Sequence, residues 1–314
     1  MHGVHIWDEH YFAFTAVLTI GIQLACFFVA YTCHFDLITD FAGSMNKVLL
    51  AIITLYLRGT YYSRQIILTA LLVVSRTELA LFLFYRVCSR KKDGRFDELH
   101  KSFWKYLGFW VYQMMWVYAT CSPIVFVNGD EANPSINAVD WIGWCIFLIG
   151  FVVQVAADFQ KFFFRKDPSN KGKICEVGVW HYSRHPNYFG EIMIWLGLFI
   201  SALNIVVASS SSPGFGWLTA ISPIFTVSVL LFLSGVPTAE GQSLRRFYKG
   251  EDNGEIWEKY AKETSPIIPC PRFIYTCLPT MAKKVFCCEY DRYKYQREME
   301  NVVGLVHQHV QRPP

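Results

Sequence analysis

The chain has 314 residues, of which 53% are hydrophobic and 17% aromatic, and its mean hydropathy is +0.25. This composition is too apolar for a soluble enzyme and indicates a polytopic membrane protein. The formal net charge of +4 is small, and no nucleic-acid partner is expected. The ten cysteines lack the spacing of a metal site or a disulfide framework. The vicinal Cys287 and Cys288 could be S-acylated, although an unmodified pair is the simpler expectation.

Apolar stretches of about 20 residues are typical of membrane-spanning helices, and about seven of them follow one another here. In chain order they are Tyr11–Tyr31, Ala42–Leu57, Arg64–Tyr85, Phe103–Val127, Val139–Phe163, Tyr188–Ala208 and Phe215–Val236. We therefore expect an all-α membrane bundle over residues 1–270, with its cofactor-binding half at about 139–270. Residues 271–314 are expected to form a cytosolic C-terminal tail.

The distribution of basic residues predicts the orientation in the membrane. Lys and Arg gather in 86–105, in 161–184 and after Pro237, whereas 128–137 and 209–214 contain neither. The positive-inside rule then places the basic segments and the C-terminus in the cytosol, and an endoplasmic reticulum membrane is expected. Arg58 and Arg64 do not fit this rule. Asp8 and Glu9 stand where a signal peptide would be basic, so the first stretch is expected to be a permanent span.

A dense polar motif lies immediately before the sixth stretch. Residues 180–191 read Trp-His-Tyr-Ser-Arg-His-Pro-Asn-Tyr-Phe-Gly-Glu, and the motif contributes Arg184, His185, Asn187, Tyr188 and Glu191. Ionisable groups at membrane depth are costly and mark function unless they only anchor a helix at the interface. Because Pro186 favours the start of a helix, the free N–H groups of that first turn would suit an anion such as a phosphate.

Other polar residues extend this candidate site. Asp158 and Lys161 have i,i+3 spacing near the end of the fifth stretch, followed by Arg165. They should emerge on the same side as the motif, so a shared site is predicted. Arg246 and Tyr248 lie on a helix leaving the bilayer, for which an interfacial amphipathic role is the alternative.

Polar residues also occur inside the expected spans. Arg76 and Glu78 could pair locally or line a cavity, because neither is expected to face lipid. Gln113 and Gln154 could simply join helices by hydrogen bonds. If a lipid enters a chamber lined by the first four spans, Tyr112, Gln113 and Glu78 are the candidates for polarising or protonating it.

These segments together resemble the family bearing the steroid 5-alpha-reductase C-terminal domain, particularly its membrane branch with Ser-Arg-His-Pro-Asn-Tyr-Phe-Gly-Glu. The other matching segments are 39–43, 95–98, 109–113, 157–161 and 235–269, so the resemblance covers most of residues 39–270. It implies a helical bundle that binds NADPH from the cytosol and reduces a carbon–carbon double bond of a steroid or other lipid. The cofactor-binding residues that it implies are Asp158, Arg184, His185, Asn187, Tyr188, Glu191, Arg246 and Tyr248.

The substrate is not implied by this resemblance. The Glu and Tyr that polarise the 3-oxo group in steroid 5-alpha reductases have no aligned counterpart, and Glu78 stands where this branch usually has Arg.

A rival class of enzyme shares the core of the motif. Isoprenylcysteine carboxyl methyltransferases and phospholipid methyltransferases also carry Arg-His-Pro-x-Tyr-x-Gly, and they bind S-adenosylmethionine. Lys161 and Arg165 favour NADPH, because cationic side chains suit its phosphates. The sequence therefore predicts an NADPH-dependent reductase, with methyl transfer as one alternative and non-enzymatic sterol binding as another. No metal site and no protein partner are predicted.

Overall fold

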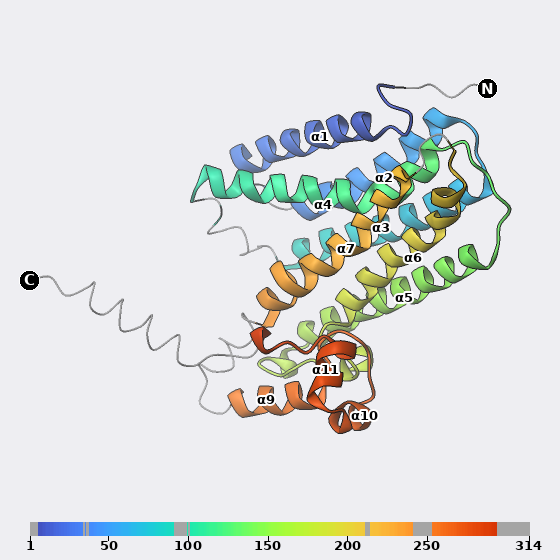
Figure 1. Cartoon of the computed structure of the whole chain (residues 1–314). Helices are drawn as coiled ribbons and strands as arrows, with labels where there is room; N and C mark the ends of the chain where they lie inside the picture. Colours follow the sequence, from blue (N-terminus) through green and yellow to red (C-terminus); the bar gives the residue numbers. More distant parts are fainter. Residues whose placement is uncertain are drawn as a thin grey trace, which may run out of the picture. The chain divides into compact units, whose positions relative to one another are not determined.

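The computed structural model describes residues 6–33, 35, 38–90, 99, 101–210, 214–240 and 253–293. Within these residues the chain is helical, and extended pairing is confined to two isolated bridges (Figure 1). The all-α prediction is therefore confirmed. The long helices are α1 (Phe12–Cys33), α2 (Ile38–Arg58), α3 (Ser63–Arg90), α4 (Phe103–Gly129), α5 (Ala138–Lys166) and α6 (Pro186–Ala208). The shorter ones include α7 (Ile221–Ser228), α9 (Asn253–Glu263), α10 (Arg272–Cys277) and α11 (Thr280–Cys287).

Among the described residues, 6 helical segments are long and apolar enough to cross a membrane. They are α1, α2, α3, α5, α6 and the run Phe215–Glu240 that contains α7. The expected span at 103–127 exists as α4, but its composition does not reach the same hydropathy. Trp104, Tyr106, Trp110, Tyr112 and other polar aromatic residues reduce its apolar character. The structure thus supports a multi-pass membrane protein and not the count of seven spans.

The chain folds as two compact units. Unit 1 consists of Met1–Phe163 and Phe189–Val227, and unit 2 consists of Phe164–Tyr188 and Ser228–Pro314. Residues 271–293 therefore belong to the same unit as the polar motif at 180–188. The predicted division into a domain at 1–270 and a separate tail stays a prediction.

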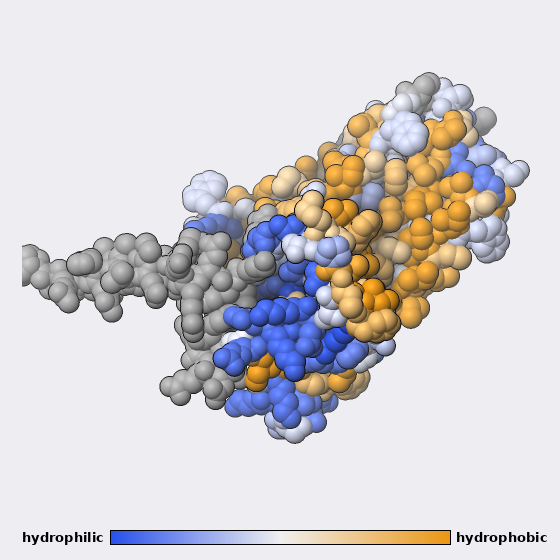
Figure 2. All heavy atoms as spheres, turned by 60° about the horizontal axis from the view of Figure 1, so that its bottom comes forward, coloured by the Kyte–Doolittle hydropathy of each residue, from blue (hydrophilic) through white to orange (hydrophobic). Residues whose placement is uncertain are grey.

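In unit 1, α2 packs against α1, α3 and α4. The core between the helices is apolar and includes Leu50, Leu72, Val117 and Phe147. Large apolar side chains also point outward, as Phe28 does with 67% of its surface exposed. Figure 2 shows such side chains in orange over the long helices, whereas hydrophilic side chains gather on the C-terminal segments. An apolar exterior over an apolar core is what a bilayer environment requires.

Helices α5 and α6 approach closely because glycines face each other. A Cβ atom on Gly150 would lie 2.7 Å from the carbonyl oxygen of Gly190, and one on Gly190 would lie 2.6 Å from that of Gly150. Both distances are too short for a real side chain. Small residues of this kind let membrane helices bring their backbones together.

The two arginines that disagree with the positive-inside rule are both neutralised. Arg64 donates to both carboxylate oxygens of Asp140, at 2.6 and 2.9 Å, and both side chains are buried. Arg58 forms an ion pair with Glu131 at 2.7 Å. Since each charge is compensated by an acid, these residues do not contribute a net positive end to the bundle.

In unit 2, backbone hydrogen bonds hold the polar motif against the segment after α9. The amide of Arg184 donates to the carbonyl of Ser265 at 2.8 Å, and that of His185 donates to Pro266 at 3.0 Å. The hydroxyl of Ser183 donates to Ile267 at 2.8 Å. The motif therefore has a fixed backbone from which Arg184 and His185 project.

Candidate functional site

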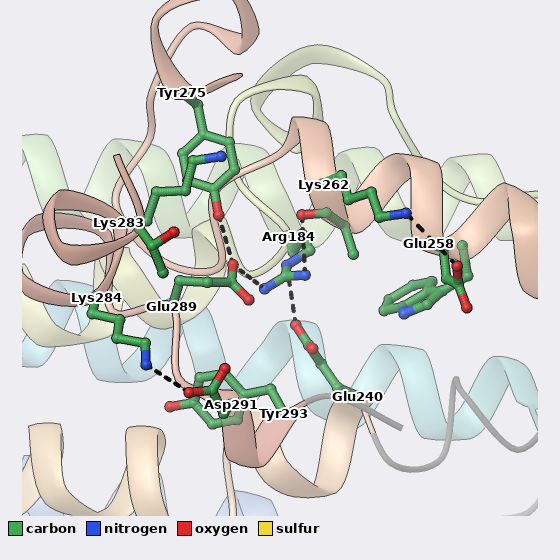
Figure 3. A pocket seen from close by; sticks show the side chains of 13 residues that line it. Arg184, Glu240, Glu258, Lys262, Tyr275, Lys283, Lys284, Glu289, Asp291 and Tyr293 are labelled. Atoms are coloured by element: carbon green, nitrogen blue, oxygen red, sulfur yellow. Dashed lines mark hydrogen bonds and ion pairs between the residues drawn. The ribbon is translucent and has the colours of Figure 1, made fainter. Parts of the chain in front are cut away.

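A pocket of about 410 Å³ lies in unit 2 around Arg184 (Figure 3). This volume is within the range of small-molecule sites, roughly 300–1,000 Å³. The wall comes from α9, α10, α11 and the segment that follows them, together with Arg184 and Glu240. The lining residues are Arg184, Glu240, Trp257, Glu258, Ala261, Lys262, Tyr275, Thr280, Lys283, Lys284, Glu289, Asp291 and Tyr293.

Arg184 is held between two carboxylates at the centre of the pocket wall. Its Nη2 donates to Glu289 at 2.8 Å, and its Nε lies 3.2 Å from a carboxylate oxygen of Glu240. Although burial disfavours the charged guanidinium, Glu240 and Glu289 outweigh that effect and raise the pKa of Arg184. Arg184 is therefore a permanent cation whose charge the protein itself already compensates.

Glu240 also binds the next residue of the motif. Its carboxylate lies 3.1 Å from Nε2 of His185, whose ring stacks on Tyr188 with centroids 5.1 Å apart. Thus one carboxylate brings together Arg184 and His185, and Tyr188 joins them by stacking on His185; all three are predicted cofactor residues. His185 and Glu240 are almost fully buried, so their contact helps to fix the position of Glu240 in the pocket wall.

The opposite side of the wall is built around Tyr275. Its hydroxyl donates to Glu289 at 2.6 Å, and the ammonium of Lys283 lies 4.6 Å from its ring centroid. Burial, followed by the nearby Glu289 carboxylate, raises the pKa of Tyr275, so the phenol stays protonated and remains a donor. Lys284 is paired with Asp291 at 2.6 Å.

Taken together, the pocket contains as many acidic as basic side chains. The acids are Glu240, Glu258, Glu289 and Asp291, and the bases are Arg184, Lys262, Lys283 and Lys284. Among the described residues of the lining the formal charges cancel, so these residues do not form a positive field. Electrostatic complementarity then favours a ligand that carries both signs of charge over one that is strongly anionic.

Glu191, the last residue of the motif, belongs to a separate cluster in unit 1. It accepts from Arg76 at 2.8 and 3.0 Å, from Gln154 at 2.7 Å and from the Trp195 indole at 2.7 Å. Its carboxylate accepts four hydrogen bonds, and through them Glu191 joins α3, α5 and α6. Arg76 pairs with this residue and not with nearby Glu78.

Asn187, Asp158, Lys161 and Arg165, which were also predicted to bind the cofactor, are not among the residues that line the pocket. Asn187 is half-buried, and its Oδ1 is buried without a hydrogen-bond partner in the described part of the chain. Asp158 and Lys161 are half-buried on α5, and Arg165 is exposed near its end. Arg246 and Tyr248 lie outside the described residues. The participation of all six in a cofactor site stays a prediction.

The three candidates for polarising a substrate are engaged differently. Gln113 donates to Oε1 of Gln23 at 3.0 Å and to the carbonyl of Thr39 at 2.9 Å, and so joins α4 to α1 and α2. The ring of Tyr112 packs against that of Phe225, with the ring centroids 6.5 Å apart. Glu78 is half-buried on α3 and close enough to Asp158 for their charges to interact. Within the described residues these three do not form one hydrogen-bonded group.

Sequence reasoning missed Glu240, Glu289 and Tyr275 as site residues. Glu240 lies in the tail segment after Pro237, six residues before the predicted Arg246, and this position was a usable signal. Glu289 and Tyr275 had no local signal, because they follow the expected membrane domain. Their role appears only when they contact Arg184, which is 105 residues from Glu289.

Comparison with known families identifies the chain. Residues 26–264 match the family model described as "Protein of unknown function (DUF1295)". The chain belongs to this family. The matched range covers the six segments long and apolar enough to cross a membrane, except residues 12–25 of α1, and it includes the motif that contains Arg184.

One curated relative of this DUF1295 protein is the "Probable O-methyltransferase ustE" of Ustilaginoidea virens. The two chains are 31% identical over 86 residues, which is 27% of this chain and 29% of the relative. The similarity therefore spans less than a third of either protein. No solved structure matches the chain.

Proposed function

We propose that this DUF1295 protein is a membrane-bound methyltransferase that binds S-adenosylmethionine in the pocket around Arg184. The observation that carries the proposal is the pairing of Arg184 with Glu240 and Glu289. An arginine between two carboxylates has no uncompensated charge left for a phosphate. The predicted preference for NADPH rested on Lys161 and Arg165, which are not among the residues that line this pocket.

S-adenosylmethionine fits the chemistry of the lining. It carries a sulfonium, an ammonium and a carboxylate, so acidic and basic side chains both find a partner. Trp257, which is almost fully buried, contributes an indole to the pocket wall and suits stacking with an adenine ring. When bound, the cofactor supplies a methyl group on sulfur; the acceptor gains that methyl and loses a proton, and the sulfonium becomes a neutral thioether. The relative named as a probable O-methyltransferase supports the same reading.

Reduction with NADPH remains the second candidate, and a specific observation favours it. Lys262, Lys283 and Lys284 all line the pocket, and the bonds of Lys262 to Glu258 and of Lys284 to Asp291 are partly exposed. Such exposed pairs are weak, roughly 0–1 kcal/mol. Phosphates could therefore compete for these lysines, whereas they could not compete for Arg184.

Calorimetric titration of the detergent-purified full chain tests the proposal. We expect S-adenosylmethionine to bind and NADPH to bind at least tenfold more weakly. Trp257→Ala should reduce the affinity for S-adenosylmethionine about tenfold or more, because one base–aromatic stack contributes about 1–3 kcal/mol. Trp217→Ala, at an exposed tryptophan of unit 1, is the matched control and should bind normally. Tight binding of NADPH without binding of S-adenosylmethionine would favour the reductase instead.

A further inference from the structure

Helix α2 places a lysine in the interior of unit 1, where a bilayer protein would normally have an apolar residue. Lys47 is only 5% exposed. Its ammonium lies 5.0 Å from the ring centroid of Trp195 and 5.6 Å from that of Trp116. Among the described residues, it makes no hydrogen bond and no ion pair. The faces of two indoles stabilise a cation, but they do not neutralise it.

Glu191, the acid that could neutralise Lys47, already forms an ion pair with Arg76. The guanidinium of Arg76 lies 5.1 Å from the same Trp195 centroid, so both cations contact one indole ring. The one carboxylate in this cluster, Glu191, accepts both of its short ion-pair contacts from Arg76. Glu78 is near enough to Arg76 for their charges to interact, but it is half-buried and forms no ion pair with either cation, so within ion-pair distance Glu191 is the one anion in the described part of this cluster. A buried excess charge is costly unless a counter-charge completes the group.

Unsatisfied polar atoms occur next to this excess charge. Asn46, only 2% exposed, has both its amide nitrogen and its amide oxygen buried without a partner among the described residues. Further along the interface of α1, α2 and α4, Nε2 of Gln23 and Oγ1 of Thr39 are buried and unpaired in the same sense. Native cores rarely leave such a group of donors and acceptors unbonded. Unbonded donors and acceptors of this kind are groups that a polar ligand could satisfy.

We infer that unit 1 binds an amphiphile whose headgroup carries a single negative charge, with Lys47 as its ion-pair partner and Asn46 as a hydrogen-bonding neighbour. The headgroup is anionic because the cluster lacks one negative charge. It is singly charged because Arg76 and Glu191 already satisfy each other. Trp116 and Trp195 provide apolar faces for the adjoining part of the lipid.

The test uses oleate as the probe, with oleyl alcohol and oleylamine as comparators of the same chain length. Binding of radiolabelled oleate to the purified full chain should be competed by unlabelled oleate at least tenfold better than by either comparator. Lys47→Met should remove this preference, and Lys47→Arg should retain it. Lys171→Met, which removes an exposed lysine of unit 2, should change nothing.

Several outcomes would overturn the inference. Equal competition by oleate and oleyl alcohol in the wild-type protein would do so, and this result does not depend on any variant folding. A preserved preference in Lys47→Met would also do so. Asn46→Leu should fold at least as well as the wild type, because it removes unbonded polar atoms, yet it should bind oleate more weakly.

The affinity for S-adenosylmethionine, measured in parallel, separates this inference from the proposed function. Lys47→Met should bind the cofactor normally. Selective oleate binding without any S-adenosylmethionine binding would reject the methyltransferase and leave the lipid site in place.

Discussion

Glu240 is the residue that binds two neighbouring side chains of the polar motif. Its carboxylate faces both Arg184 and His185, and all three side chains are at most 6% exposed. Glu240→Gln would leave the buried Arg184 with Glu289 as its one remaining carboxylate. Removing one partner of a buried ion pair typically costs about 3–5 kcal/mol, and the remaining acid should keep the loss near 3 kcal/mol. Thermal unfolding of the purified protein measures this loss.

Glu258→Gln is the matched control for that measurement. Glu258 lines the same pocket, but its bond to Lys262 is long, at 3.8 Å, and exposed. Such an i,i+4 pair contributes only about 0.3–0.5 kcal/mol. If both variants lost the same small amount of stability, Glu240 would not hold the pocket wall as described.

The sequence revealed least about which charged residues form ion pairs with one another. Arg76 and Glu78 are two positions apart, so a local pair was a natural expectation, yet Arg76 binds Glu191 from 115 residues away. Arg184 was recognised as a site residue because of its place in the motif. Its carboxylate partners were not, because nothing in the spacing of the chain shows that residues 240 and 289 return to residue 184.

At the scale of helices, the apolar runs predicted most boundaries to within a few residues because lipid exposure imposes a continuous apolar face. Helix α2 is the informative exception. It was expected at 42–57 and extends over Ile38–Arg58, since the residues that the prediction left out include the polar Thr39 and Asp40 at its start and Arg58 at its end. A prediction from hydropathy ends the helix at such polar residues, whereas the helical backbone continues through them.

The close approach of α5 and α6 makes a second prediction. Gly150→Ala would place a Cβ within 2.7 Å of the Gly190 carbonyl oxygen, so the helices must separate. Overpacking of this kind typically costs about 1–3 kcal/mol. Gly21→Ala is the control, because a Cβ on that glycine of α1 meets no other atom within 4 Å. It should be neutral or stabilise by up to about 1 kcal/mol. Equal melting temperatures for the two variants would contradict the packing.

At the scale of the whole molecule, the basic segments predict which ends of the helices face the cytosol. Two single substitutions create glycosylation acceptors: Pro134→Ala at Asn133-x-Ser135, and Glu255→Thr after Asn253. In a eukaryotic cell, a mobility shift that is sensitive to endoglycosidase should appear for Pro134→Ala and not for Glu255→Thr. The reverse pattern would invert the orientation and put the proposed cofactor pocket outside the cytosol.

The composition alone was enough to predict a helical membrane protein, but it could not choose the cofactor. Both candidate classes of enzyme share the Arg-His-Pro core, and they differ in the charge that the pocket must meet. That charge depends on Glu289 and Asp291, which lie beyond the segments resembling either class. The choice between NADPH and S-adenosylmethionine therefore required the folded arrangement of unit 2.

The most direct test of the central claim is to map where S-adenosylmethionine crosslinks. The purified full chain, irradiated with methyl-labelled S-adenosylmethionine and digested, should carry label on peptides from residues 253–293 that line the pocket, such as the one with Trp257. Excess unlabelled S-adenosylmethionine should abolish the label, and NADPH should leave it unchanged. Label confined to peptides of unit 1, or displaced by NADPH at equal concentration, would contradict a methyl-donor site around Arg184.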